Sequence, residues 1–121
     1  MIALVWALVG LSALQPAARL RCEAQQKWLC ELPAGCSPAN AASTWQIVDF
    51  DKRTYARCDR AGCDTYEMVI TVSGAFRTLQ PVGHPDVFLK IGLANLFVEV
   101  ATIGVSTYTS LGTCRPEPRP R

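Results

Sequence analysis

The sequence predicts an all-β domain: a small antiparallel meander of about seven strands that closes into a barrel or sandwich, preceded by an irregular, disulfide-containing N-terminal segment. The first observation is a series of short runs of β-branched and aromatic residues after residue 43, separated at regular intervals by turn-forming residues. The second is the presence of six cysteines in only 121 residues. A chain of this size has a thin core, so covalent cross-links would add much to its stability.

The first segment of the chain is apolar and uncharged. Residues 2–14 have the length of a signal-peptide core and are too short to span a bilayer, which takes about 20 residues. We therefore expect residues 1–24 to be a signal peptide, cut after Ala18 or after Ala24, and the mature protein to be periplasmic or secreted. The alternative is a buried N-terminal element of an intracellular protein.

Residues 25–43 are expected to form the irregular N-terminal segment. They show no helical period, and they hold several turn formers: Pro33, Gly35, Pro38 and Asn40. Residues 115–121, after the last cysteine, alternate proline with charged residues. Because proline cannot donate a hydrogen bond to a sheet, this end is expected to be a disordered tail.

Residues 44–114 are expected to form the β-domain. The expected strands are 44–50, 53–58, 64–73, 75–80, 86–92, 96–103 and 105–112. Short turns separate them, so consecutive strands should pair as hairpins. Apolar residues alternate with polar ones, as Met68 and Ile70 do with Glu67 and Thr71, so one face of each strand should turn inward. An open sheet would leave two edges unpaired, which is why we expect closure.

Cys58 and Cys63 flank the turn formed by residues 59–62, between two expected strands. Opposed residues of a hairpin have Cα atoms about 4.5 Å apart, a distance that a disulfide can bridge. We therefore expect a disulfide here, worth about 2 kcal/mol because it closes a short loop. The alternative is a zinc site that combines this pair with Cys30 and Cys36, but an oxidising compartment favours disulfides.

Cys114 needs a partner from the N-terminal part of the chain, and Cys22, Cys30 or Cys36 could supply it. Such a bridge would close a loop of about 80 to 90 residues and contribute about 4.5 kcal/mol. All six cysteines are accordingly expected to form disulfides. A cut after Ala24 would remove Cys22 and leave one thiol without a partner.

Charge and motif content argue against several classes of function. The net charge is only +2 and the basic residues are scattered, so we expect no nucleic-acid binding. The single histidine, His84, lies in a turn, and the chain has no glycine-rich phosphate loop. Four of the acidic residues lie at strand ends, where aspartate commonly caps turns: Asp49, Asp51, Asp59 and Asp64. We therefore expect a protein that is not an enzyme, with no catalytic residues, no metal site and no cofactor.

The remaining expectation is binding. The protein should bind an unknown protein partner or a small-molecule ligand in the cell envelope, without a stable membrane span after cleavage. A disulfide-closed turn is rigid and loses little entropy on docking. Asp59 and Arg60, in the turn between Cys58 and Cys63, and Asp64, directly after Cys63, are therefore candidate partner-binding residues.

Two resemblances bear on this expectation. The motifs TWQIVDF, TYARCDRAGCDTY, FLKIG, FVEVATIG and SLGTC, spread over residues 44–114, look like those of small exported α-proteobacterial proteins of unknown function. The motif SGAF at 73–76, followed by Arg77, resembles the periplasmic lysozyme inhibitors of the MliC type. This second resemblance implies a small β-barrel with a C-terminal cysteine bridge, and it adds Ser73, Gly74 and Arg77 as possible partner-binding residues. A C-type lysozyme inhibitor and a zinc-stabilised structural protein are the alternatives to the general binding domain.

Overall fold

Strands make up most of residues 18–118, the part of the chain that this computed structural model describes. The strands are β1 (Arg19–Glu31), β2 (Gly35–Pro38), β3 (Trp45–Asp49), β4 (Thr54–Asp59), β5 (Gly62–Ser73), β6 (Phe76–Pro81), β7 (Val87–Ile91), β8 (Leu96–Ile103) and β9 (Ser106–Pro116). Two short 3-10 turns, η1 (Ala41–Ser43) and η2 (Leu93–Asn95), lie in the connections. Within these residues, no helix has the length and apolar character needed to cross a membrane.

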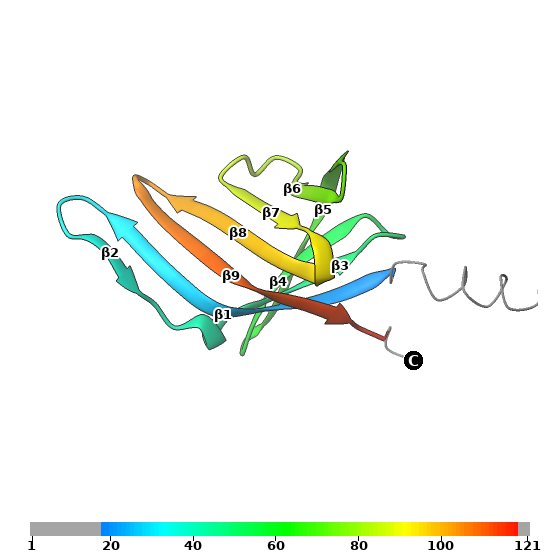
Figure 1. Cartoon of the computed structure of the whole chain (residues 1–121), viewed down its shortest axis with the longest axis horizontal. Coiled ribbons are helices and arrows are strands. Elements are labelled where there is room, and N and C mark those ends of the chain that lie inside the picture. Colours follow the sequence, from blue (N-terminus) through cyan, green and yellow to red (C-terminus); the bar gives the residue numbers. More distant parts are fainter. Residues whose placement is uncertain (1–17, 119–121) are drawn as a thin grey trace, which may run out of the picture.

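The strands form one antiparallel sheet that closes on itself. Neighbours along the chain pair as hairpins from β3 to β9, and β9 then pairs with β1 along almost its whole length. On its other side, the first half of β1 pairs with β3 and the second half pairs with β2. The strands β1 and β3 to β9 therefore close a barrel, and β2 extends the sheet at one end (Figure 1).

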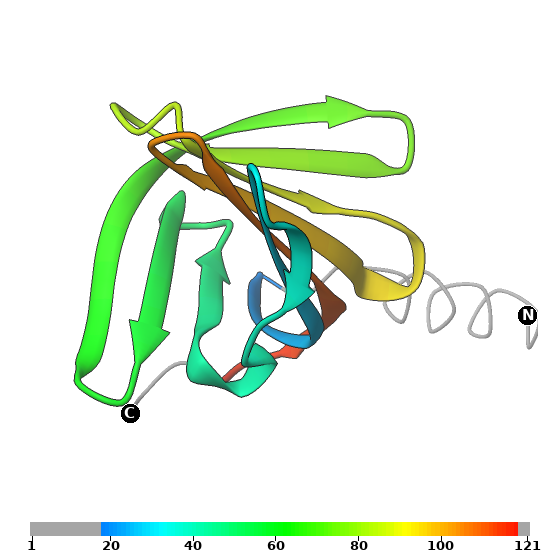
Figure 2. The same ribbon diagram turned by 90° about the vertical axis from the view of Figure 1, so that its left-hand side faces the viewer.

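The two ends of the barrel carry different parts of the chain. The β1–β2 and β8–β9 hairpins lie at one end, and the start of β1 and the end of β9 lie together at the other (Figure 1). The N–H group of Glu117 donates to the carbonyl of Arg19 at 3.0 Å, and Arg19 Nη1 donates to the carbonyl of Pro118 at 3.1 Å. Figure 2 shows the molecule from the side of the two hairpins.

The predicted all-β antiparallel fold is confirmed, but the strand count is nine rather than seven. Each of the seven expected strands is present close to its expected bounds. Residues 25–43 are not irregular as predicted, because they contain most of β1 and all of β2. The sequence hides β1 because polar side chains and an extra residue interrupt its alternation, and because its partners β3 and β9 are distant in sequence.

The predicted chain boundaries also need correction. Residues 19–24, which the prediction includes in a signal peptide, form the first part of β1, and Leu20 and Cys22 belong to the core. Ala24, one of the two expected cut sites, thus lies inside a strand, whereas Ala18 directly precedes it. Residues 115 and 116, predicted to be part of a disordered tail, continue β9. Residues 1–17, with the expected signal-peptide core, and residues 119–121 lie outside the described part of the chain.

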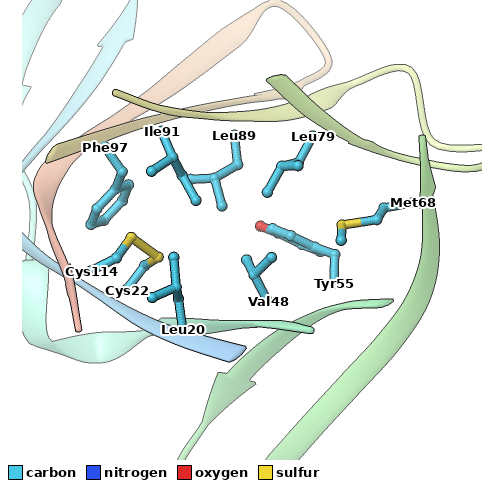
Figure 3. Close-up of a cluster of buried hydrophobic side chains, with 10 residues drawn as sticks. All are labelled: Leu20, Cys22, Val48, Tyr55, Met68, Leu79, Leu89, Ile91, Phe97 and Cys114. Atoms are coloured by element: carbon cyan, nitrogen blue, oxygen red, sulfur yellow. A yellow bond between two sulfur atoms is a disulfide. The ribbon is translucent and has the colours of Figure 1, made fainter. Parts of the chain in front are cut away.

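An apolar core fills the barrel toward the end where the described chain begins and ends. Its members come from β1 and β3 to β9: Leu20, Cys22, Val48, Tyr55, Met68, Leu79, Leu89, Ile91, Phe97 and Cys114 (Figure 3). In β5 the predicted inward face is correct for Met68, whereas Val72, which the same alternation would place inward, is exposed. In β8 the inward positions are Phe97, Glu99 and Ala101.

Three disulfides fasten the barrel and its hairpins. Cys22–Cys114 joins β1 to β9 at directly opposed positions, so it lies across the seam that closes the barrel. Cys30–Cys36 joins β1 to β2, and Cys58–Cys63 joins β4 to β5 as predicted. Since each cysteine of residues 18–118 is paired, no thiol is left to ligate the zinc of the alternative prediction. The three bridges are consistent with an oxidising, extracytoplasmic environment.

Candidate functional site

The barrel interior changes from apolar to polar toward the end that carries the hairpins. Inward-facing polar residues from five strands form this part, which we call the polar layer: Lys27, Gln46, Arg57, Glu99 and Ser110. Arg57 is half-buried and the other four are buried. Ser110 lies opposite both Lys27 and Glu99 in the strand register, and Gln46 lies opposite Arg57. Burying polar and charged groups is costly unless they are paired. The contacts of these five residues therefore show which of them are stabilised by a partner.

A β-bulge in β1 determines which side chain of that strand enters the polar layer. The register with β9 shifts between Ala24 and Gln26, so Gln25 is an extra residue. Cys22 points inward before the bulge, and Lys27 points inward after it. Strict alternation from Cys22 through Gln25 would turn Lys27 outward; because the bulge accommodates Gln25 as an extra residue, the amine of Lys27 stays inside the barrel.

Gly112 of β9 allows the two strands to approach at the bulge. A Cβ atom at this position would collide with the backbone of Glu23 and Ala24. Glycine is the residue that fits where two backbones come so close. The position of Lys27 therefore depends on Gln25 in one strand and on Gly112 in the other.

Glu99 is the central acceptor of the polar layer. The hydroxyl of Tyr55 donates to Glu99 Oε2, and Arg57 Nη2 lies 4.0 Å from Glu99 Oε1. Tyr55 belongs to the apolar core, and its hydroxyl oxygen points into the barrel interior (Figure 3). Burial raises the pKa of Tyr55, and the charge of Glu99 and the hydrogen bond to it raise that pKa further.

The contacts of the Lys27 amine are a hydroxyl and an aromatic ring. The amine donates to Thr44 Oγ1 at 3.3 Å and lies 5.5 Å from the centroid of the Tyr108 ring. Among residues 18–118 it takes part in no ion pair. Burial lowers the pKa of Lys27, the charge of Arg57 lowers it further, and Glu99 opposes both effects. The cation is thus held in an environment that disfavours its charge.

Gln46 adds an unpaired acceptor to the polar layer. Its side chain is 1% exposed, and its Oε1 atom has no hydrogen-bond partner among the described residues. Buried acceptors in proteins are nearly always paired. The polar layer therefore contains one buried acceptor whose hydrogen-bonding capacity is not used by the described residues.

A cavity of about 300 Å³ lies where the polar layer meets solvent, and we call it the mouth. Its lining residues are Lys27, Ala39, Asn40, Ser43, Arg57, Ile103 and Tyr108. Local hydrogen bonds hold the η1 loop that forms one wall: Asn40 Oδ1 accepts from the N–H of Ala42 at 3.1 Å, and Ser43 Oγ donates to the carbonyl of Asn40 at 2.9 Å. The N–H of Ala39 donates to the carbonyl of Lys27 at 2.8 Å, which ties this loop to β1.

The structure divides the predicted partner-binding residues between two places. Asp59 and Arg60 line a second hollow that shares Asn40 and Ser43 with the mouth. Asp64 is exposed on β5, opposite Arg57 in the strand register. These three residues therefore lie near the mouth.

Ser73, Gly74 and Arg77 belong to the β5–β6 hairpin, away from the mouth. Ser73 and Gly74 are exposed at its tip, where Gly74 has a φ of +59°. Arg77 is half-buried, and its guanidinium lies 4.1 Å from the centroid of the Phe50 ring. Arg77 is thus packed on an aromatic ring instead of extending from the hairpin.

Sequence reasoning missed Lys27, Arg57, Glu99 and Tyr108 as site residues. A signal in the sequence did mark Arg57 and Glu99, because each is a charged residue within an expected strand. Alternation alone does not say which face of such a strand is inside. No such signal marked Lys27, because neither its strand nor the bulge in that strand was predicted.

A different hollow of about 390 Å³ lies on the outside of the barrel and is apolar. Phe76, Leu93, Leu96 and Val98 contribute to it, and the amine of Lys90 lies 4.8 Å from the centroid of the Phe76 ring. It has one cation and no inward-facing polar group. The mouth is therefore the site with the richer recognition chemistry.

Comparisons of the chain with family models, with characterised proteins and with solved structures found no match. The fold and the site define a class of protein: a disulfide-stapled antiparallel β-barrel with a polar mouth at one end.

The Tyr55–Glu99 pair predicts a specific response to alkaline pH. The ordinary tyrosine pKa is 10.0, and that of Tyr55 in the folded chain is higher. Above pH 10 the unfolded chain therefore releases a proton that the folded chain retains, and stability should fall by about 1.4 kcal/mol per pH unit, with no such loss below pH 10. Urea unfolding between pH 8 and 11 should show this slope, and Tyr55→Phe should reduce it.

Ultraviolet absorbance provides the control. While both proteins are folded, the wild type and the Tyr55→Phe variant should show the same tyrosine ionisation between pH 9 and 11. In urea the wild type should show one tyrosine more. An extra ionising tyrosine in the folded wild type would contradict the burial of this hydroxyl.

Proposed function

We propose that the chain is an exported, non-catalytic binding barrel that acts in the periplasm or outside the cell, and that it holds a small ligand in its mouth. The observation that carries this proposal is the mouth itself: a cavity of about 300 Å³ lined by two cations at one end of a barrel whose other end is filled by the core. Ligand sites commonly occupy the mouths of β-barrels.

The lining of the mouth supports binding as its role. Lys27 and Arg57 offer charge, Asn40 and Ser43 offer polar groups, and Tyr108 offers an aromatic face. Two hairpins near the mouth are closed by disulfides, Cys30–Cys36 and Cys58–Cys63. Rigid walls lose little conformational entropy when a ligand binds, which favours affinity.

The export part of the proposal has two supports. The apolar run 2–14 has the length of a signal-peptide core, and the three disulfides fit an oxidising compartment. A cut after Ala18 would leave β1 whole, whereas a cut after Ala24 would remove Leu20 and Cys22 from the barrel. We therefore propose Ala18 as the last residue of the leader, which mass spectrometry of the secreted protein would check.

A fragment screen by two-dimensional NMR tests the binding function. Small molecules of positive, negative and neutral character should be added to the ¹⁵N-labelled disulfide-bonded protein. We expect at least one class to shift the amide signals of Lys27, Asn40, Arg57 and Tyr108. Ser43→Trp should weaken this binding by filling the mouth, and Thr71→Trp on the exposed side of β5 should not. Binding found at other surfaces only would contradict the proposal.

A further inference from the structure

The charge balance of the polar layer identifies the chemistry of a ligand. We infer that the mouth binds a small organic carboxylate, with its carboxylate group between Lys27 and Arg57 and its apolar part against Tyr108 and Ile103. This inference rests on the proposed function, which places a ligand in the mouth. It goes beyond that function by naming the class of ligand.

The polar layer contains two cations and one carboxylate. Lys27 and Arg57 contribute +2 and Glu99 contributes −1, so their sum is +1. Arg57 lies 4.0 Å from Glu99, whereas the amine of Lys27 has a hydroxyl and an aromatic ring as its contacts. An excess charge in a half-buried site is unfavourable unless an opposite charge accompanies it. One bound monoanion would bring the sum of these three buried or half-buried groups to zero; the carboxylate of Asp64, opposite Arg57, is exposed to solvent.

The same sum favours a carboxylate over a phosphate. A carboxylate carries a single negative charge at neutral pH, and its addition neutralises the layer. A phosphate monoester carries about −1.5 to −2 charges, and it would leave excess negative charge beside the buried carboxylate of Glu99. Repulsion between like charges is stronger beside a buried group than in bulk water.

The donors suit a carboxylate in geometry as well as in charge. The planar guanidinium of Arg57 can present two parallel N–H groups to the two oxygens of a carboxylate. The amine of Lys27 has three donors, and Thr44 Oγ1 accepts one of them. Both side chains line the mouth, so a ligand there meets donors from β1 and β4 together.

The size and the remaining walls limit the rest of the ligand. A volume of about 300 Å³ is at the lower end of the range of ligand pockets, which corresponds to one ring or a short chain. Tyr108, Ile103 and Ala39 provide apolar surface for such a group. The expected ligand is therefore a compact aromatic or short aliphatic acid.

Isothermal titration calorimetry and NMR with benzoate as the probe test this inference on the intact disulfide-bonded protein. Benzamide has the same ring without the charge, and inorganic phosphate tests the competing anion. We expect benzoate to shift the amide signals of the mouth and to bind at least ten-fold more tightly than either compound. Lys27→Met and Arg57→Gln should each weaken benzoate at least ten-fold, and raising the salt concentration should also weaken it.

Lys90→Met is the matched control. Lys90 also lies over an aromatic ring, that of Phe76, but beside the apolar hollow on the outside of the barrel. This variant should bind benzoate like the wild type. Circular dichroism would check that all three variants fold, and two independent variants of the mouth keep the test decisive if one does not.

Four outcomes would overturn the inference. Equal binding of benzoate and benzamide at the mouth would show that the mouth does not recognise the carboxylate, while leaving the binding function intact. Tighter binding of phosphate than of benzoate would show that the mouth prefers another anion to a carboxylate. Benzoate signals confined to the apolar hollow, or no benzoate binding, would also reject the inference, and the fragment screen would then decide separately whether the mouth binds anything else.

Discussion

Replacing both Cys22 and Cys114 by alanine is expected to lower the free energy of unfolding by about 4.5 kcal/mol. The two cysteines are separated by 92 positions in the sequence, so their bridge removes much conformational freedom from the unfolded chain. The bridge also crosses the seam between β1 and β9, which closes the barrel, and both residues are buried in the core. Urea unfolding of the oxidised proteins would measure the difference.

The hairpin disulfide Cys58–Cys63 provides the comparison. Its sequence separation is 5, and the same chain-entropy argument gives a loss of only about 2 kcal/mol for its double alanine variant. The expected order of stability is wild type, then Cys58→Ala with Cys63→Ala, then Cys22→Ala with Cys114→Ala. Equal losses of unfolding free energy for the two pairs would show that chain entropy does not determine how much the Cys22–Cys114 bridge stabilises the protein.

Replacing Glu99 by leucine is expected to cost about 3 kcal/mol. Leucine has a similar volume, but it leaves the hydroxyl of Tyr55 without its acceptor in the core and Arg57 without its carboxylate. It also raises the charge of the polar layer from +1 to +2. Glu99→Gln keeps an acceptor for Tyr55 and should cost less. Thermal and urea unfolding would measure both variants.

Glu23 offers a matched surface carboxylate. It forms two shorter ion pairs, with Arg21 at 2.7 Å and with Arg115 at 2.9 Å, but its side chain is 48% exposed. Exposed ion pairs contribute little, so Glu23→Leu should cost less than about 1 kcal/mol. If this surface variant lost as much stability as Glu99→Leu, the stabilising role assigned to the buried carboxylate of Glu99 would be wrong.

The pattern of strand and turn residues along the chain predicted the part of the fold in which strands pair with their sequence neighbours. From β3 to β9 each strand pairs with its sequence neighbour, and the turns between them are short. The same reasoning located Cys58 opposite Cys63. It failed for β1, which is stabilised by β3 and β9 and whose alternation is reversed by the bulge at Gln25. Long-range pairing of this kind leaves little trace in the strand itself.

The candidate site was harder to predict than the fold. In β8, Val98 and Val100 alternate with Glu99 and Ala101, and hydrophobicity alone would place the valines inside. The closed barrel turns Glu99 inward instead, because Tyr55 and Arg57 supply its partners from the opposite wall. A charge is stable at an inward position only when the rest of the sheet provides its contacts, and those contacts exist only in the assembled barrel.

The pairing of Arg19 with Glu117 and Pro118 brings the two ends of the described chain together, at the end of the barrel opposite the mouth. A tether attached at either terminus would therefore hold the molecule by its base, with the mouth directed away from the surface that carries it. Immobilisation on a sensor chip, fusion to another domain or display on a cell could then use either end without obstructing the entrance.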